Sequence, residues 1–133
     1  MFLNKLDEES KKVFLQLAYY VAKCDESISN TEETLISQFR KEIDMPESDY
    51  NPEDFSLVEA IAKITNKEYQ KIILMELMAI VYADNVMHVA EKEIIDTIVD
   101  EWCINSSLAV VYGEWAKGLL SLYTQGEALL ELN

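Results

Sequence analysis

Hydrophobic residues recur every three or four positions along most of the chain, which is the period of an amphipathic α-helix. The pattern predicts a first helix over about 8–24, after Asp7, and a second helix that begins near Ser29 or Asn30. The segment 44–52, DMPESDYNP, contains both prolines of the chain and interrupts the pattern. We therefore expect two N-terminal helices followed by a break.

The helical pattern resumes after this break. Pro52 suits the first position of a third helix over about 53–63. Thr65 with Glu68 has the spacing of a capping box, which opens a fourth helix over about 66–83. The fourth helix is apolar on almost every side, as is typical of the central helix of a bundle. The remaining predicted helices span about 90–103 and about 106–125, the latter ending at Gly126 before a short ALLEL turn.

Part of this pattern occurs twice, 59 residues apart. CDESISNTE at 24–32 and ADNVMHVAE at 83–91 each contain a small residue, then Asp, then Glu seven positions later. Apolar residues on both sides of the motif also correspond at this offset: Phe14 with Ile73, Val21 with Ile80, Ile28 with Met87, Leu35 with Ile94, Ile36 with Ile95 and Phe39 with Ile98. The sequence therefore predicts two copies of one helical hairpin, over about 8–45 and about 66–104.

These elements predict an all-α bundle of six or seven helices, built from two pseudo-symmetric hairpin repeats and a C-terminal helix. A length of 133 residues, half of them hydrophobic, fits a single domain over 1–133 and excludes a disordered acidic tail. With three Gly and two Pro, the chain has little turn chemistry for a β-rich fold. The residues expected in the core include Phe14, Val21, Phe39, Ile73, Leu77, Ile80, Ile95 and Trp102.

The formal net charge of −14 decides which partners suit the chain. An acidic surface repels the phosphates of nucleic acids and anionic lipid headgroups, so its candidate partners are cations, basic protein segments or simply water. The longest apolar run, 72–83, contains Glu76 and is too short for a transmembrane segment. The N-terminal segment does not resemble an export signal, and Cys24 and Cys103 lack CxxC spacing. We therefore expect a cytoplasmic protein with reduced thiols in its core.

The two acidic turns have two interpretations. An Asp at the end of one helix and a Glu in the first turn of the next can act only as caps, which the helix dipole favours by about 0.3–1 kcal/mol. If the hairpins instead pack about a pseudo-two-fold axis, Asp25, Glu32, Asp84 and Glu91 form one acidic cluster. Such oxygen-rich clusters bind hard divalent cations of the calcium or magnesium type. The residues alone leave both interpretations open.

Other site chemistries fail on residue type or spacing. An EF-hand is excluded, because the twelfth position is Ile36 counted from Asp25 and Ile95 counted from Asp84, where a bidentate Glu is needed. His88 is the single histidine, which excludes zinc sites that need two or more. Neither glycine-rich nucleotide motif occurs and no nucleophile stands beside a base, so the chain is not expected to be an enzyme.

The repeated turn, small–Asp–x–x–apolar–x–x–x–Glu between an apolar and an amphipathic helix, resembles the TerB-like family. This family includes tellurite-resistance TerB proteins and a related domain found beside J-domains in some membrane-anchored co-chaperones. The resemblance covers about residues 8–104 and implies two pseudo-symmetric helical halves whose acidic turn residues bind metal ions. Carried over to this chain, the implied metal ligands are Asp25, Glu32, Asp84 and Glu91.

The chain departs from the family at the residue that follows the Asp, where Gly is usual. Glu26 and Asn85 occupy this position, and Asn tolerates a left-handed backbone that Glu adopts poorly. The residue before the Asp, usually Ala, is Cys24 in the first copy and Ala83 in the second. The second copy is therefore the better match.

The expected function is that of a non-enzymatic TerB-like acidic helical domain that binds divalent cations and acts in the stress response. The alternative is a protein-interaction scaffold whose acidic face docks a basic partner, with no ion involved. A cation role predicts carboxylates within coordination distance of one another. A scaffold predicts dispersed carboxylates and an exposed apolar patch. The identity of the protein partner and the oligomeric state do not follow from the sequence.

Overall fold

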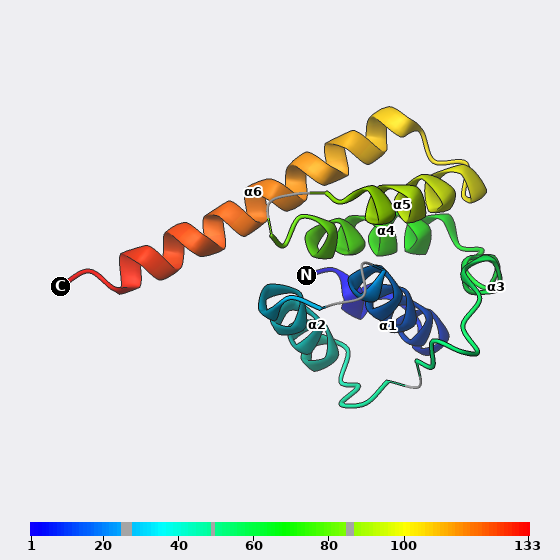
Figure 1. The fold of residues 1–133 in the computed structure, drawn as a ribbon, viewed down its shortest axis with the longest axis horizontal. Helices are drawn as coiled ribbons and strands as arrows, with labels where there is room; N and C mark the ends of the chain where they lie inside the picture. Colours follow the sequence, from blue (N-terminus) through cyan, green and yellow to red (C-terminus); the bar gives the residue numbers. More distant parts are fainter. Residues whose placement is uncertain (25–27, 49, 85–86) are drawn as a thin grey trace.

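The computed structural model describes residues 1–24, 28–48, 50–84 and 87–133, and all its regular elements within these ranges are helical (Figure 1). In chain order they are a 3-10 turn η1 (Leu3–Lys5), α1 (Glu8–Lys23), α2 (Asn30–Glu42), α3 (Leu57–Ala62), α4 (Lys67–Val81), α5 (Val89–Glu101) and α6 (Ser106–Leu130). The predicted all-α class is therefore confirmed. In this described part of the chain, no helix combines the length and the apolar character needed to cross a membrane.

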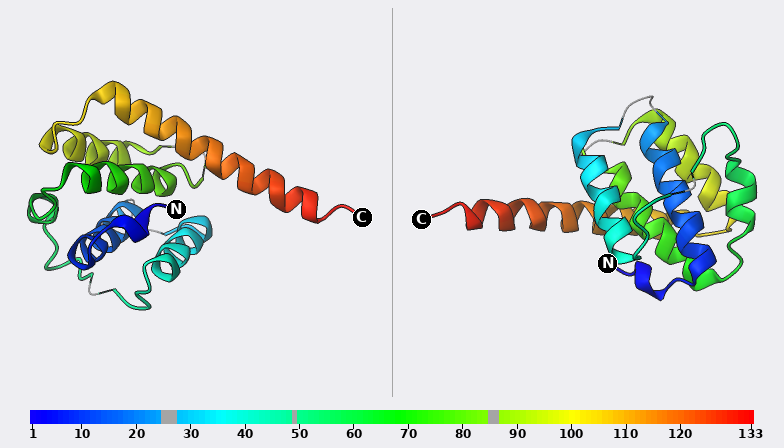
Figure 2. Two further views of the ribbon diagram at one scale, coloured as in Figure 1. Left: turned by 180° about the vertical axis from the view of Figure 1, so that it is seen from behind. Right: turned by 90° about the horizontal axis from the view of Figure 1, so that it is seen from below.

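The other elements pack around α4. This helix contacts η1, α1, α2, α5 and α6. In Figures 1 and 2, α5 and the first part of α6 lie on one side of α4, and α1 and α2 cover the other. Ile73, Leu74 and Leu77 of α4 are completely buried, and the eight residues predicted for the core are all at most 6 % exposed. The predicted role of this segment as the central helix is confirmed.

The boundaries of the two hairpins follow the 59-residue offset seen in the sequence. α1 begins at residue 8 and α4 at residue 67, while α2 spans 30–42 and α5 spans 89–101. The caps of the first helices correspond too: Asp7 accepts from the Ser10 amide at 2.8 Å and Asn66 from the Tyr69 amide at 3.1 Å. The Asn66 cap corrects the predicted Thr65–Glu68 capping box, because a side chain one residue later satisfies the free amide of the first turn.

The second helix of each hairpin ends in the same way. Asp44 and Cys103 follow α2 and α5 with φ angles of 55° and 53°, which is the left-handed conformation of a Schellman-type helix end. The next amide, that of Met45 or Ile104, donates back into the last turn at 2.9 or 3.0 Å. Cys103 is therefore exposed beyond the end of α5, and its predicted place in the core is wrong.

The third helix is shorter than predicted. The pattern predicts about 53–63 with Pro52 first, but α3 spans Leu57–Ala62 only. The Asn51 side chain accepts from the Glu53 amide at 3.1 Å and its carbonyl accepts from the Phe55 amide at 3.0 Å. This local turn competes with a helix for the same backbone groups. α3 begins only after Ser56, whose hydroxyl accepts from the Glu59 amide at 3.3 Å.

The last helix runs beyond its predicted end. Gly126 does not adopt a positive φ, and α6 continues through it to Leu130. Glycine ends a helix chiefly where the backbone turns left-handed, which this position does not require. The second half of α6 projects away from the bundle and carries the C-terminus (Figures 1 and 2).

Glu76 is a charged residue on the most buried helix, and it is only 2 % exposed. A buried carboxylate is costly unless it is paired. Its Oε1 atom accepts from the Phe2 amide and pairs with the Met1 ammonium, each at 2.9 Å. The same ammonium pairs with Glu42 at 3.0 Å, so the start of the chain is tied to both α4 and α2.

The burial of α4 generates a first prediction. Leu77→Ala should lower the free energy of unfolding by about 2–5 kcal/mol, because it opens a cavity at the centre of the core. Urea denaturation of wild type and variant measures this loss. Leu132→Ala, the same substitution at a side chain that is 72 % exposed, is the control and should change stability little. If Leu77→Ala lowers the free energy of unfolding by less than about 0.5 kcal/mol, Leu77 does not lie at the centre of the core.

The left-handed residue after α5 generates a second prediction. Cys103→Gly should raise the free energy of unfolding by about 0.5–1 kcal/mol, because glycine adopts this φ without steric cost and the exposed thiol loses no packing. Cys103→Ala removes the thiol but keeps the strain, so it should bring no gain. Equal urea midpoints for the two variants would contradict the explanation.

Candidate functional site

Glu32 and Glu91 occupy equivalent places in the two hairpins, in the first turn of the helix that follows each acidic loop. Each carboxylate folds back to cap its own helix. The Glu32 Oε1 atom accepts from the Ser29 amide at 2.9 Å, and the Glu91 Oε1 atom accepts from the His88 amide at 3.0 Å. The Ser29 hydroxyl completes the predicted capping box by accepting from the Glu32 amide at 3.1 Å. Unlike most capping residues, both glutamates are buried, with exposures of 6 % and 2 %.

The environment of Glu91 disfavours its charged form. Burial raises the pKa of this carboxyl from its ordinary value of 4.5 to about 7. The hydrogen bond from the His88 amide and the charge of the His88 ring oppose this rise in the pKa, while charge repulsion from Glu32 and Asp84 adds to it. The carboxylates of Glu32, from α2, and of Asp84, from the end of the α4 segment, therefore lie within electrostatic reach of Glu91.

His88 forms the outer side of this group. Its Nε2 atom lies 3.0 Å from the Asp84 carboxylate, and both side chains are partly exposed. The pair joins the two sides of the turn between α4 and α5. A protonated His88 supplies positive charge beside Asp84 and Glu91, whereas a neutral His88 does not.

Of the four predicted metal ligands, Glu32 and Asp84 lie close enough to Glu91 for their charges to raise its pKa. The fourth, Asp25, lies outside the described residues, as do Glu26 and Asn85. Among the residues that the structure describes, no group of three or more His, Cys, Asp or Glu side chains has an arrangement that could hold a metal ion. The four-ligand site therefore stays a prediction.

Two features of the site escape the sequence reasoning. The first is the ion pair of His88 with Asp84, whose only signal in the sequence is the spacing of four residues. Burial of both glutamates is the second, because a glutamate in the first turn of a helix is usually exposed. The motif's apolar flanking residues were the available signal for that burial.

A buried carboxyl with a pKa near neutrality has two ways to lose its repulsion. It can bind a proton, or a cation can lie between it and the neighbouring carboxylates. Carboxylate oxygens suit hard divalent cations, and the backbone bonds already hold one oxygen of each glutamate in place. The buried Glu91 carboxyl can therefore bind a proton near neutral pH.

Comparisons with known proteins do not identify the chain. It matches no protein-family model, no curated protein and no solved structure.

The raised pKa of Glu91 predicts how stability depends on pH. The folded protein binds more protons than the unfolded chain between about pH 4.5 and 7. Stability should therefore fall by roughly 2–3 kcal/mol as the pH rises through this window, and this contribution should be constant above it. Urea denaturation in the presence of a chelator, from pH 4 to pH 8, measures the slope.

Variants assign this slope to one residue. Glu91→Gln should flatten the dependence and raise stability at pH 8, since a neutral amide keeps the backbone bond without the buried charge. Glu93→Gln, an exposed substitution in the same helix, should leave the slope unchanged. A slope that survives Glu91→Gln would exclude this glutamate as its cause.

Proposed function

We propose that this chain is a non-enzymatic, TerB-like acidic helical domain that holds a divalent cation between the acidic turns of its two hairpins and acts in the stress response. The observation that carries the proposal is the burial of Glu32 and Glu91, 59 residues apart and close enough to interact. The role in the stress response rests on the family resemblance alone.

Helix capping by itself accounts poorly for this arrangement. A carboxylate at a helix N-terminus stabilises the helix by about 0.3–1 kcal/mol through the helix dipole. This stabilisation is available at an exposed position and does not require burial. Burying a carboxylate near others of like charge costs more than that gain, as the raised pKa of Glu91 reflects. A bound divalent cation would offset this cost.

The proposed ligands are oxygen atoms of Glu32, Glu91 and Asp84, with Asp25 as the fourth. In the arrangement described, Asp84 binds His88 instead, so cation binding includes the exchange of His88 for the ion. An all-oxygen set of this kind favours calcium or magnesium over zinc. Backbone bonds to both glutamates would orient their carboxylates for the ion.

The proposal includes a structural part. The two hairpins would be copies of one unit related by a pseudo-two-fold axis, which brings their second helices to a common point. Their matching helix boundaries and their matching left-handed ends at Asp44 and Cys103 support this reading.

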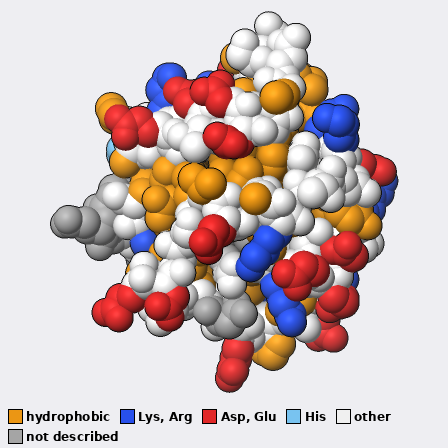
Figure 3. All heavy atoms as spheres, turned by 90° about the vertical axis from the view of Figure 1, so that its right-hand side faces the viewer, with side chains coloured by type: hydrophobic (Ala, Val, Ile, Leu, Met, Phe, Trp, Pro, Cys, Tyr) orange, Lys and Arg blue, Asp and Glu red, His pale blue; other side chains and the backbone are white. Residues whose placement is uncertain are grey.

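A second candidate is a scaffold that docks a basic partner without an ion. It is favoured by the outer face of α5, where Glu93, Asp96, Asp100 and Glu101 are all exposed. One cation, Lys92, lies among them and pairs with Asp96 at 2.8 Å. The face at the α3 end of the molecule is a poorer candidate, because acidic and basic side chains are interspersed there around apolar areas (Figure 3).

The cation proposal is tested by thermal unfolding with calcium, magnesium, manganese or zinc. An ion that binds only the folded state stabilises it by about 2.7 kcal/mol at a hundredfold excess over its dissociation constant. Calcium or magnesium should therefore raise the melting temperature, and should also remove most of the pH dependence assigned to Glu91. Unchanged melting with all four ions at millimolar concentration would refute the proposal and favour the scaffold.

Matched variants separate a site from general relief of the negative charge. Glu32→Gln and Glu91→Gln should abolish the response to the ion. Glu33→Gln and Glu93→Gln remove the same charge from exposed neighbours and should retain it. Equal responses from all four variants would show that the ion acts on the net charge alone.

The two Asp residues provide a further comparison. Asp84→Asn should weaken the response more than Asp25→Asn, because Asn85 suits the left-handed turn of the family motif and Glu26 does not. Isothermal titration of each variant measures the change in affinity. A larger loss at Asp25 would reverse this ranking of the two turns.

A further inference from the structure

The two halves of α6 have different surroundings. The first half packs on the bundle, where Ala109 and Ala116 are buried and the Cβ of a residue larger than Gly113 would lie 3.2 Å from the Tyr82 ring. The second half projects into solvent (Figures 1 and 2). Every residue from Ser121 to Leu130 except Gly126 is exposed.

The apolar face of α6 continues onto this projecting half. Its members recur at intervals of three and four residues, in register with the residues that pack on the bundle. This free stripe consists of Leu119, Leu122, Tyr123, Gly126, Leu129 and Leu130. Leu122, Tyr123 and Leu129 are 65 %, 58 % and 67 % exposed, and Leu130 is 88 % exposed.

A short helix that exposes its apolar face has only marginal stability in water. Isolated helices shorter than about 12–15 residues are marginal even with good helix formers. The projecting half also contains Gly126, which costs roughly 1 kcal/mol relative to Ala. Packing against another surface would therefore stabilise this half of α6.

We propose that the free stripe binds the free stripe of a second copy of this chain, so that the two α6 helices pack antiparallel in a symmetric dimer. Charge favours this occupant. No charged side chain occurs from Gly118 to Gly126, in a chain whose net charge is −14. Two copies can approach each other along this segment with less repulsion than over the rest of their acidic surface.

A basic partner fits the stripe less well. Basic segments are recognised by carboxylates, and such groups lie on α5 rather than among the residues 118–126. The complementary surface must itself be apolar and nearly uncharged. The same segment of a second copy has both properties.

The stripe is also self-complementary in shape. Tyr123, its largest side chain, stands three residues before Gly126, its smallest. A side chain added at Gly126 would meet nothing within 4 Å, so there is open space above this residue. In an antiparallel pair centred between these two positions, Tyr123 of each copy packs over Gly126 of the other.

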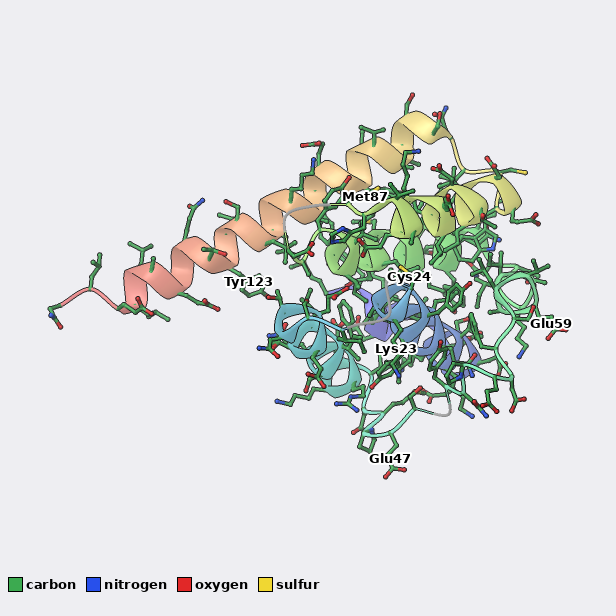
Figure 4. The ribbon with its side chains drawn as sticks, viewed as in Figure 1. Lys23, Cys24, Glu47, Glu59, Met87 and Tyr123 are labelled. Carbon is green, nitrogen blue, oxygen red and sulfur yellow. The ribbon has the colours of Figure 1, made fainter. Side chains whose placement is uncertain are left out.

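A groove next to the stripe enlarges the contact. It has a volume of about 550 Å³ and lies between α2 and α6, with Thr34 and Leu35 on one wall and Leu120 and Tyr123 on the other. Figure 4 shows Tyr123 on the side of α6 toward α2. Two short helices alone bury less than the roughly 800 Å² per partner of a standard interface. The dimer should therefore use the groove as well, with an affinity on the order of micromolar.

Sedimentation equilibrium over a range of protein concentrations tests the proposal. The mass should rise from 15.3 kDa toward twice that value as the concentration increases. The experiment is done at about 0.15 M salt, to screen repulsion between the acidic chains, and with a chelator. The chelator makes the outcome independent of cation binding. A mass of 15.3 kDa at every concentration up to roughly a hundred times the expected micromolar dissociation constant would overturn the proposal.

Leu122→Asp and Val110→Asp form a matched pair. Both side chains are 65 % exposed on α6, but Val110 lies on the opposite face of the helix. Leu122→Asp should weaken dimerisation at least roughly tenfold, and Val110→Asp should change it less than about twofold. Equal effects of the two variants would overturn the assignment of the interface to the stripe.

Gly126→Leu keeps the test valid if Leu122→Asp disturbs the helix. Leucine has a higher helix propensity than glycine and adds apolar surface, so it should stabilise the projecting helix itself. It also occupies the space proposed for Tyr123, and should therefore weaken dimerisation at least roughly tenfold while the helix signal in circular dichroism is retained. Stronger dimerisation by this variant would contradict the proposed packing.

Discussion

The burial of α4 is the interaction on which the rest of the structure depends. η1, α1, α2, α5 and α6 contact this helix, and Ile73, Leu74 and Leu77 are completely buried. A short helix gains little from its own hydrogen bonds in water, so most of its stability comes from apolar packing of this kind. Because α4 is apolar on nearly all sides, the surrounding helices each bury one face against it. This burial also removes the Glu76 carboxylate from water, which is unfavourable. Its bonds with the Phe2 amide and the Met1 ammonium offset the loss of solvation.

The packing around α4 also places the acidic turns. α2 and α5 begin at equivalent points of their hairpins, and their first-turn glutamates come close enough for Glu32 to raise the pKa of Glu91. Each glutamate accepts a hydrogen bond from a backbone amide at the start of its own helix. Because both carboxylates are buried near each other, the negative charge of one disfavours the charged form of the other. Proton binding, which causes the predicted pH dependence, and the proposed cation binding would both relieve this repulsion. The dimer proposal concerns another part of the molecule, and it stands or fails separately.

Local chemistry explains which predictions were correct and which were wrong. The apolar periodicity located α1, α2, α4 and α5, because these helices bury one broad stripe or more. The short α3 was predicted too long, since the turn around Asn51 uses side-chain and backbone bonds that periodicity does not report. Cys103 was placed in the core because it continues the pattern of α5, but the helix ends two residues earlier, at Glu101, and Cys103 itself has a left-handed backbone.

The sequence by itself determined the all-α class, the positions of the long helices, the core residues and the 59-residue offset between the boundaries of α2 and α5. These features depend on spacing along the chain, which the order of residues contains directly. The tertiary structure alone decided that Glu32 and Glu91 are buried together, that His88 pairs with Asp84, and that half of α6 leaves the bundle. Burial and electrostatic coupling depend on distances between residues far apart in the chain. An apolar stripe has the same sequence whether its partner lies in the same molecule or in another one.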